Sequence, residues 1–298
     1  MQEHILEIKN LTKYYGKVKG VENLSLAIDG GEIFGFIGPN GAGKSTTIRS
    51  VMNLINKNSG TVKVCGKEFL RDDTETKRMI GYLPSEVFLY DDLTVGRIFD
   101  YHESFYAKQG DGKAIHERKC ELVERLKLDE SKMIEDLSLG NLKKTGIILA
   151  LMHSPKLVIM DEPTSGLDPI IQNVFYELLL EERERGTAIF YSTHILSEIS
   201  KICDRVGIIR NGELIKVEKT SELSDKNLTF VTVKSKDKKK IIDDLGVKPV
   251  SEDEEQIRFA NTLPDDVLIK KLAAYKIDRI LIEEATLEEM FMHYYTEE

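Results

Sequence analysis

Apolar and polar residues alternate near the start of the chain, in the pattern of strands with one buried face. In the stretch 21–29, Leu24, Leu26 and Ile28 are separated by single residues. A preceding strand is predicted at residues 3–9. Both stretches predict strands that lie on one side of a core.

The next segment changes character, because residues 33–37 are apolar without interruption apart from one glycine. An unbroken apolar run is typical of a strand that is buried on both faces, as in a parallel sheet. A glycine-rich loop follows, and a helix is predicted from Ser45 to about Ile55. Further short strands are predicted at 61–65 and 79–83.

Helical periodicity dominates the middle of the chain, where the apolar residues recur every three or four positions. It predicts helices at 93–106, 114–128 and 142–152, with Thr94 as the cap of the first. The pattern then returns to strands, which are predicted at 157–160 and 187–192.

Two turn signals locate further elements between residues 168 and 217. Asp168-Pro169 predicts a helix start, with a capping carboxylate and proline at the first helical position, and that helix is predicted to run to about Arg185. Asn211-Gly212 predicts a two-residue hairpin turn within residues 206–217.

The composition shifts near residue 220, and shorter elements alternate beyond it. Strands are predicted at 228–234, 256–260 and 277–283, and helices at 237–244, 264–274 and 286–295. This order predicts a small α+β domain of the ferredoxin-like kind at residues 221–298, after a larger domain at residues 1–220. A regulatory or dimer-stabilising role of the smaller domain is a hypothesis.

Charge and composition narrow the class of protein. The net charge of −9 on 298 residues argues against sequence-independent binding to nucleic acid. No apolar run approaches the ~20 residues that span a bilayer, and the first residues lack the pattern of a signal peptide. The three cysteines are few and widely spaced, as free thiols in a reducing compartment are. We therefore expect a cytoplasmic protein that reaches a membrane only through a partner.

The glycine-rich loop carries the first candidate chemistry, since it matches the phosphate-binding pattern G-x-x-x-x-G-K-[ST]. The matching residues are Gly38, Pro39, Asn40, Gly41, Ala42, Gly43, Lys44 and Ser45. Glycines let backbone N–H groups surround phosphates, and the helix that follows adds the positive end of its dipole. The Lys44 ammonium is expected to contact the phosphates and the Ser45 hydroxyl to ligate Mg²⁺.

A second candidate is the apolar strand at 157–160, which ends in Asp161 and Glu162. Alone, such an ending is more often a helix cap or a solvated turn. Beside a phosphate loop, Asp161 is expected to hold Mg²⁺ and Glu162 to orient or deprotonate the attacking water.

These motifs together resemble the ABC (ATP-binding cassette) ATPase family over roughly residues 3–220, and the stretch 161–169, DEPTSGLDP, is the most specific part. The resemblance implies an α/β fold of the P-loop NTPase type. Its mixed-sheet core would carry a helical subdomain at about 86–155. It also implies ATP and Mg²⁺ as ligands and ATP hydrolysis as the activity.

Several further roles follow from the resemblance alone. Tyr15 matches the aromatic residue that stacks on adenine, with Tyr14 as the alternative, and Thr46 follows the phosphate loop in the nucleotide site. Asp168 matches an aspartate at the interface of two cassettes. His194 matches the switch histidine that contacts the γ-phosphate, beside Glu162 as the second catalytic residue.

Two segments depart from the family pattern. Ser85 stands where the family has a glutamine that reaches Mg²⁺ and the attacking water, so a bridging water would be needed there. The signature Leu-Ser-Gly-Gly-Gln appears as residues 137–141, LSLGN, in which Ser138 and Gly140 are retained. These two residues are expected to meet the γ-phosphate held by a partner cassette.

One cassette supplies half of each site, so the resemblance implies a homodimer or a heterodimer with a related cassette. It also implies an integral membrane permease as partner. The LSLGN segment and the small C-terminal domain resemble the bacitracin or multidrug export branch. The alternative is a soluble ABC ATPase in DNA repair or translation, although such proteins usually carry a coiled-coil insertion or a second cassette. Other phosphate-loop classes, such as kinases and GTPases, do not account for residues 161–169 and His194.

Overall fold

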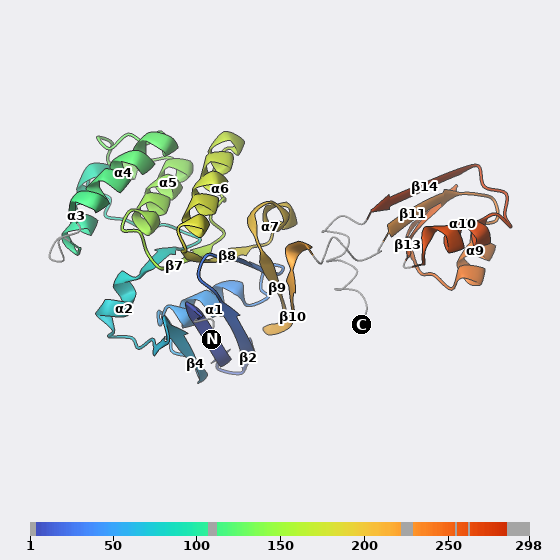
Figure 1. Ribbon diagram of the computed structural model, residues 1–298, viewed down its shortest axis with the longest axis horizontal. Coiled ribbons are helices and arrows are strands. Elements are labelled where there is room, and N and C mark those ends of the chain that lie inside the picture. The colour runs from blue at the N-terminus through green and yellow to red at the C-terminus, as the bar shows by residue number, and fades with distance from the viewer. Residues whose placement is uncertain (1–3, 107–111, 222–228, 254, 262, 285–298) are drawn as a thin grey trace. The chain divides into compact units, whose positions relative to one another are not determined.

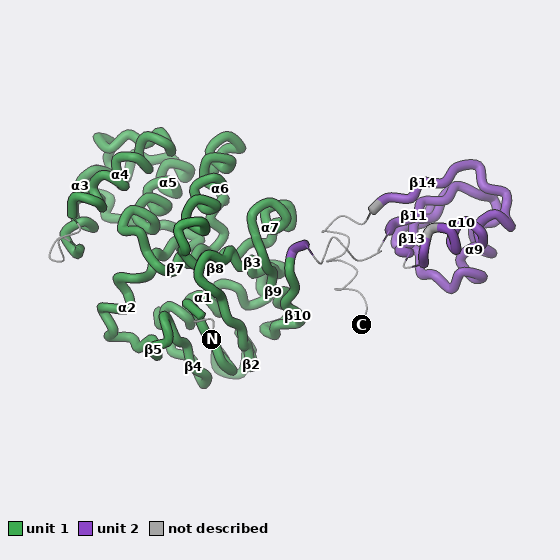
Figure 2. The backbone as a smooth tube through the Cα atoms, viewed as in Figure 1, with its two compact units in different colours: residues 1–219 green, residues 220–298 purple. Residues whose placement is uncertain are grey.

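The computed structural model describes residues 4–106, 112–221, 229–253, 255–261 and 263–284. The chain divides into two compact units, residues 1–219 and 220–298, which Figure 2 colours separately. The first unit has two sheets and the second has one, and each unit has its own buried apolar cluster. None of the described helices is both long enough and apolar enough to cross a membrane.

A six-stranded sheet forms the centre of the first unit, in the order β10-β9-β3-β8-β7-β6. Its strands are β3 (Ile33–Ile37), β6 (Ile80–Leu83), β7 (Leu157–Asp161), β8 (Ala188–Thr193), β9 (Arg205–Arg210) and β10 (Glu213–Lys219). Neighbouring strands run parallel except at the β9–β10 hairpin. The sheet is therefore mixed, as predicted.

The three central strands of this sheet are buried along their whole length. Every residue of β3, β7 and β8 is buried, which agrees with the unbroken apolar runs in β3 and β7. Phe36 packs against Phe190 of the neighbouring strand with ring centroids 5.2 Å apart. Burial on both faces fixes the strands, and hence the position of the residues that follow them.

A second sheet in this unit is antiparallel and has the order β2-β1-β4-β5. Its strands are β1 (Leu6–Tyr15), β2 (Val18–Ile28), β4 (Ser59–Val64) and β5 (Lys67–Glu68). The first strand was predicted too short, because its pairing is irregular after Ile8 and Asn10 has a positive φ of 49°. This irregularity breaks the alternation, while the strand itself continues to Tyr15.

The helices of the first unit include a group that lies between β6 and β7 in the chain. The unit contains α1 (Lys44–Val51), α2 (Thr74–Arg78), α3 (Val95–Ser104), α4 (Gly112–Leu126), the 3-10 helix η2 (Ile134–Asp136), α5 (Leu139–Leu151), α6 (Pro169–Glu184) and α7 (Leu196–Ile202). Helices α3, α4 and α5 lie side by side (Figure 1), and they are the helical part that the pattern predicted.

The predicted caps and the predicted turn are present. Thr94 accepts a hydrogen bond from the Arg97 N–H at 3.3 Å. Asp168 caps α6 by accepting from two backbone N–H groups, and Pro169 is the first helical residue. Asn211 and Gly212 both have positive φ, as the two-residue hairpin turn requires.

Some element predictions were wrong. The third helix of the middle region begins at Leu139 and not at residue 142, because Ser138 caps it and draws the signature segment into its first turn. The pattern also missed α2, α7 and the edge strand β12 (Pro249–Glu252), which are short. The last predicted helix, residues 286–295, lies outside the described residues.

The second unit is a four-stranded antiparallel sheet in the order β12-β13-β11-β14. Its elements along the chain are β11 (Thr229–Lys234), α9 (Lys238–Leu245), β12, β13 (Gln256–Asn261), α10 (Asp265–Leu272) and β14 (Arg279–Glu284). This β-α-β-β-α-β order is that of the ferredoxin-like fold. Phe259 is fully buried in its apolar cluster, together with residues from both helices.

Candidate active site

The candidate residues of the first unit gather at one edge of the six-stranded sheet. Strands β3, β7 and β8 are parallel, so their carboxyl ends meet at the same edge. Gly38 follows β3, Glu162 follows β7 and His194 follows β8. Open parallel sheets bind ligands at this edge, which makes it the natural position for the site.

The loop from Gly38 to Ser45 needs glycine at two positions for physical reasons. Gly43 has a φ of +110°, and a Cβ there would lie 2.6 Å from the Gly20 carbonyl oxygen. A Cβ on Gly38 would lie 2.4 Å from the carbonyl oxygen of Ile209. Any larger residue at either position would push the loop off its neighbouring strands.

The turn of the β9–β10 hairpin is hydrogen-bonded to this loop. The Gly212 N–H donates to the Ala42 carbonyl at 2.9 Å, and the Glu22 N–H donates to the Gly212 carbonyl at 2.7 Å. Within the loop, the Ala42 N–H donates to the Pro39 carbonyl at 3.1 Å. The hairpin turn that the sequence predicted therefore holds the phosphate loop in shape.

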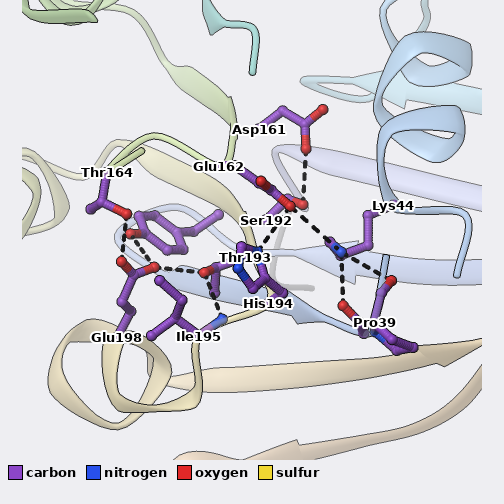
Figure 3. A network of polar contacts seen from close by, with 12 residues as sticks. Pro39, Lys44, Asp161, Glu162, Thr164, Ser192, Thr193, His194, Ile195 and Glu198 are labelled. Carbon is purple, nitrogen blue, oxygen red and sulfur yellow. Dashed lines mark hydrogen bonds and ion pairs between the residues drawn. The ribbon is translucent and has the colours of Figure 1, made fainter. Parts of the chain in front are cut away.

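Lys44 begins α1, and its side chain folds back over the loop (Figure 3). Its ammonium donates to the carbonyls of Gly38 at 2.7 Å and Pro39 at 3.2 Å, and it lies 3.8 Å from a Glu162 carboxylate oxygen. Burial lowers the pKa of Lys44, and the nearby carboxylates of Glu162 and Asp161 partly oppose this shift.

The two carboxylates at the end of β7 have different surroundings. Asp161 is buried and accepts a hydrogen bond from the Ser192 hydroxyl at 3.1 Å. Glu162 is partly exposed, and its Oε1 lies 3.1 Å from Nδ1 of His194 (Figure 3). Glu162 has a positive φ of 48°, which is uncommon for a residue with a side chain, and its N–H is held by the Ser192 carbonyl at 3.0 Å.

A cleft of about 240 Å³ lies against the phosphate loop. It is lined by Tyr15, Lys19, Gly20, Asn40, Gly41, Gly43, Lys44, Ser45, Thr46 and Glu162. Tyr15 therefore faces the cleft, while the hydroxyl of Tyr14 donates to Glu22 at 2.7 Å. Sequence reasoning missed Lys19 and Gly20, because both lie on β2, outside any motif.

The signature residues lie next to the loop that precedes α6. A Cβ on Gly140 would lie 2.8 Å from the Gly166 carbonyl oxygen, so the two segments touch. The hydroxyl of Ser138 and the carboxylate of Asp168 both cap helices within the chain. The neighbouring Leu139 side chain is 63% exposed. These residues do not contribute to the lining of the cleft.

Ser85 lies in the loop that follows β6, where its carbonyl accepts a hydrogen bond from Lys143 at 2.6 Å. Lys143 is buried on α5. Burial lowers its pKa, and the negative charges of Asp161, Glu162 and Glu86 partly oppose this shift. No sequence motif pointed to Lys143, because a lysine within a helix is usually solvated.

A second buried charged side chain, Glu198 on α7, was also missed. Its carboxylate accepts hydrogen bonds from four hydroxyl groups, which belong to Thr164, Tyr176, Tyr191 and Thr193 (labelled in part in Figure 3). The Thr193 hydroxyl in turn accepts from the Ile195 N–H at 3.0 Å. The loop that contains His194 is thereby fixed on both sides of the histidine.

Among the described residues, no group of three or more His, Cys, Asp and Glu side chains is placed to hold a metal ion. A divalent cation at this edge would instead share its ligands with a bound phosphate. Ser45 and Asp161 supply the hydroxyl and carboxylate oxygens that Mg²⁺ prefers in such sites.

Known proteins resemble this chain in sequence and in fold. Residues 21–165 match the family model described as ABC transporter. The linearmycin resistance ATP-binding protein LnrL of Bacillus subtilis is 37% identical over 222 residues, which are 74% of this chain and 70% of LnrL. The bacitracin transport ATP-binding protein BcrA of Bacillus licheniformis is 35% identical over 249 residues, which are 80% of this chain and 77% of BcrA.

The matched region spans 63% of another relative, an uncharacterised ABC transporter ATP-binding protein of Synechocystis that is 35% identical. A solved structure is similar as well, with a TM-score of 0.64 and 25% identity over 72% of this chain and 98% of that one. It is a dimeric ATP-binding cassette in a post-hydrolysis state, bound to ADP and Pi.

Proposed function

The chain belongs to the family of ABC transporter ATP-binding proteins, and on this premise we propose that it energises a separate membrane permease that exports its substrate. The family has ATP as its ligand and ATP hydrolysis as its reaction. The observation that carries the proposal is the cleft between the phosphate loop and Glu162, with His194 beside it.

The side chains at the cleft suggest how ATP is bound and cleaved. The phosphate loop and the first turn of α1 would surround the β- and γ-phosphates, and Tyr15 would stack on the adenine. Lys44 would exchange its carbonyl partners for phosphate oxygens. Glu162 would orient or deprotonate the attacking water, and His194, held by Glu162, would contact the γ-phosphate.

We propose that Mg²⁺ binds with ATP, through the Ser45 hydroxyl and the Asp161 carboxylate. When bound, this ion supplies positive charge to the phosphate oxygens. Ser85 is a weaker candidate ligand, because its described contact is made by the backbone carbonyl.

The site is proposed to be completed by a second cassette, either another copy or a close relative. Gly140 lies beside Gly166, and neither Ser138 nor Gly140 lines the cleft at the phosphate loop. These residues, together with Asp168, would face the γ-phosphate of the partner cassette. ATP would then close the dimer and hydrolysis would release it, a two-state element biased by its ligand.

The proposed contact with the permease is an aromatic surface on the helical part of the unit. Phe88 is 84% exposed and Tyr90 is 60% exposed. The Tyr90 ring packs edge-on against Tyr101, and Tyr101 against Phe105. Clustered exposed aromatic side chains are typical of protein–protein interfaces.

An exported substrate is proposed because LnrL is named for linearmycin resistance and BcrA for bacitracin transport. Recruitment by the permease would place the chain at the inner face of the cell membrane. A soluble role in DNA repair or translation is the alternative, and the net charge of −9 argues against nucleic acid as a partner.

Affinity purification of the tagged chain from its native membranes in mild detergent tests this proposal. We expect an integral membrane protein to co-purify in stoichiometric amount, and the double variant Phe88→Ser/Tyr90→Ser to lose it while retaining ATP binding. Val250→Ser, an exposed change on the second unit, serves as the control. A wild-type preparation that brings only ribosomal or DNA-bound material would favour the soluble class.

A further inference from the structure

The buried ammonium of Lys143 connects three segments of the first unit. Its side chain is 2% exposed and comes from α5. It donates to the backbone carbonyls of Pro84 at 3.3 Å, Ser85 at 2.6 Å and Glu162 at 3.3 Å. An ammonium has three N–H donors, so the three carbonyls use all of them.

The packing of α5 against β6 explains how Lys143 reaches these carbonyls. A Cβ on Gly146 would lie 2.7 Å from a Leu83 side-chain carbon, and one on Gly81 would lie 2.0 Å from the Ala150 carbonyl oxygen. The helix and the strand therefore touch along two glycines. Lys143 lies one turn before Gly146, over the loop in which β6 ends.

The contact with Glu162 matters because of the backbone conformation of this residue. Its φ of 48° lies in the left-handed region, where a residue with a side chain is held only by its surroundings. The Ser192 carbonyl holds the N–H of Glu162, and Lys143 holds its carbonyl. The two hydrogen bonds fix the peptide groups on both sides of the catalytic carboxylate.

We propose that Lys143 is a positioning residue for ATP hydrolysis. From α5, it holds the Glu162 backbone and the Pro84-Ser85 loop in one fixed arrangement. This proposal rests on ATP hydrolysis at Glu162 and requires no permease. Through hydrogen bonds to Lys143, the loop that precedes Phe88 is connected to the backbone of the catalytic Glu162.

The test compares steady-state ATP hydrolysis by the purified full-length chain and its variants. Lys143→Met keeps an unbranched side chain, one atom shorter than lysine, but removes the donors. We expect its kcat to fall about 10- to 100-fold, which corresponds to about 1.4–2.7 kcal/mol. The dissociation constant for ATP should stay within about twofold, because the cleft lining is unchanged.

Two further variants separate positioning from a general loss of structure. Lys143→Gln retains an N–H donor on a side chain one atom shorter and is expected to recover part of the lost kcat. Lys144→Met, the adjacent lysine on the same helix, is the matched control and should keep kcat within about twofold.

A double-mutant comparison then asks whether Lys143 acts through Glu162. Residues that act as a unit are not additive, so Lys143→Met should reduce turnover no further when Glu162→Gln is already present. Three results would overturn the proposal: an unchanged kcat in Lys143→Met, equal losses in kcat and ATP affinity, or a full additional loss in the double variant. Absent turnover in the wild-type chain would instead count against the proposed ATPase mechanism.

Discussion

The six-stranded sheet of the first unit and the sheet of the second unit differ in how their strands are buried. The candidate active site lies only at the first of these two sheets. In the first unit, β3, β7 and β8 are buried throughout and parallel, so three candidate residues meet at one edge. In the second unit, β13 alternates between buried and more exposed residues, and its sheet is antiparallel. Every residue that lines the cleft belongs to the first unit.

The comparison shows what a parallel sheet contributes to this protein. Strands buried on both faces cannot shift without disturbing the core on each side, so their carboxyl ends form a rigid platform. The one-sided sheet of the second unit needs only an apolar face under its two helices. Changes at the carboxyl ends of these strands should therefore lower ATP turnover, and changes in the second unit should not alter ATP affinity.

The largest expected effect is on the first unit. Glu162→Gln should lower ATP turnover by about 10²–10⁴-fold, the usual contribution of a general base, while ATP still binds. Steady-state hydrolysis and equilibrium binding in the same preparation measure both quantities. Turnover at the wild-type rate would exclude Glu162 as the base.

The second prediction tests the independence of the other unit. Phe259→Ala removes a fully buried ring from the second cluster and should cost about 3–5 kcal/mol in the unfolding free energy of that unit. The affinity for ATP should change by less than about twofold. Chemical unfolding followed by ATP titration checks both, with the exposed Val250→Ala as control. A large loss of ATP affinity would break the proposed separation.

The smallest effect is a dependence on pH within the first unit. Burial lowers the pKa of His102 and His153 to about 4, from an ordinary value of 6.5. Because the unfolded chain binds more protons between these values, stability should be lost as the pH falls from about 6.5 to about 4. Since both rings are partly exposed, we expect a total loss of only about 1–3 kcal/mol.

Thermal unfolding at a series of pH values measures this effect. The variant His102→Gln should show a shallower loss of stability over the same range. A wild-type chain whose transition does not move between pH 6.5 and 4.5 would contradict the assignment of two half-buried neutral histidines.

The sequence was informative wherever one local pattern determines the structure. Unbroken apolar runs predicted β3 and β7, and the turn signals at Asp168-Pro169 and Asn211-Gly212 predicted the start of α6 and the β9–β10 hairpin. Irregular positions were harder to predict, because the bulge near Asn10 and the cap at Ser138 change the pattern of apolar and polar residues over only one or two positions.

Contacts between segments that are distant in the chain could not be predicted from the sequence. The motifs located Lys44, Glu162 and His194, which follow buried strands. They gave no signal for Lys143 or Glu198, because a charged residue in a helix is usually solvated and only the fold shows that these are buried. The partners of each come from segments that are far apart in the chain.

The central claim is that ATP bridges two cassettes, since Ser138 and Gly140 do not line the cleft of their own chain. The most direct measurement is the mass of the Glu162→Gln variant, purified from its native cells so that a related cassette can pair with it. Size-exclusion chromatography with light scattering would be run with Mg-ATP and with Mg-ADP. We predict a particle with two cassettes in ATP and a single chain in ADP, whereas the same mass in both nucleotides would contradict the account.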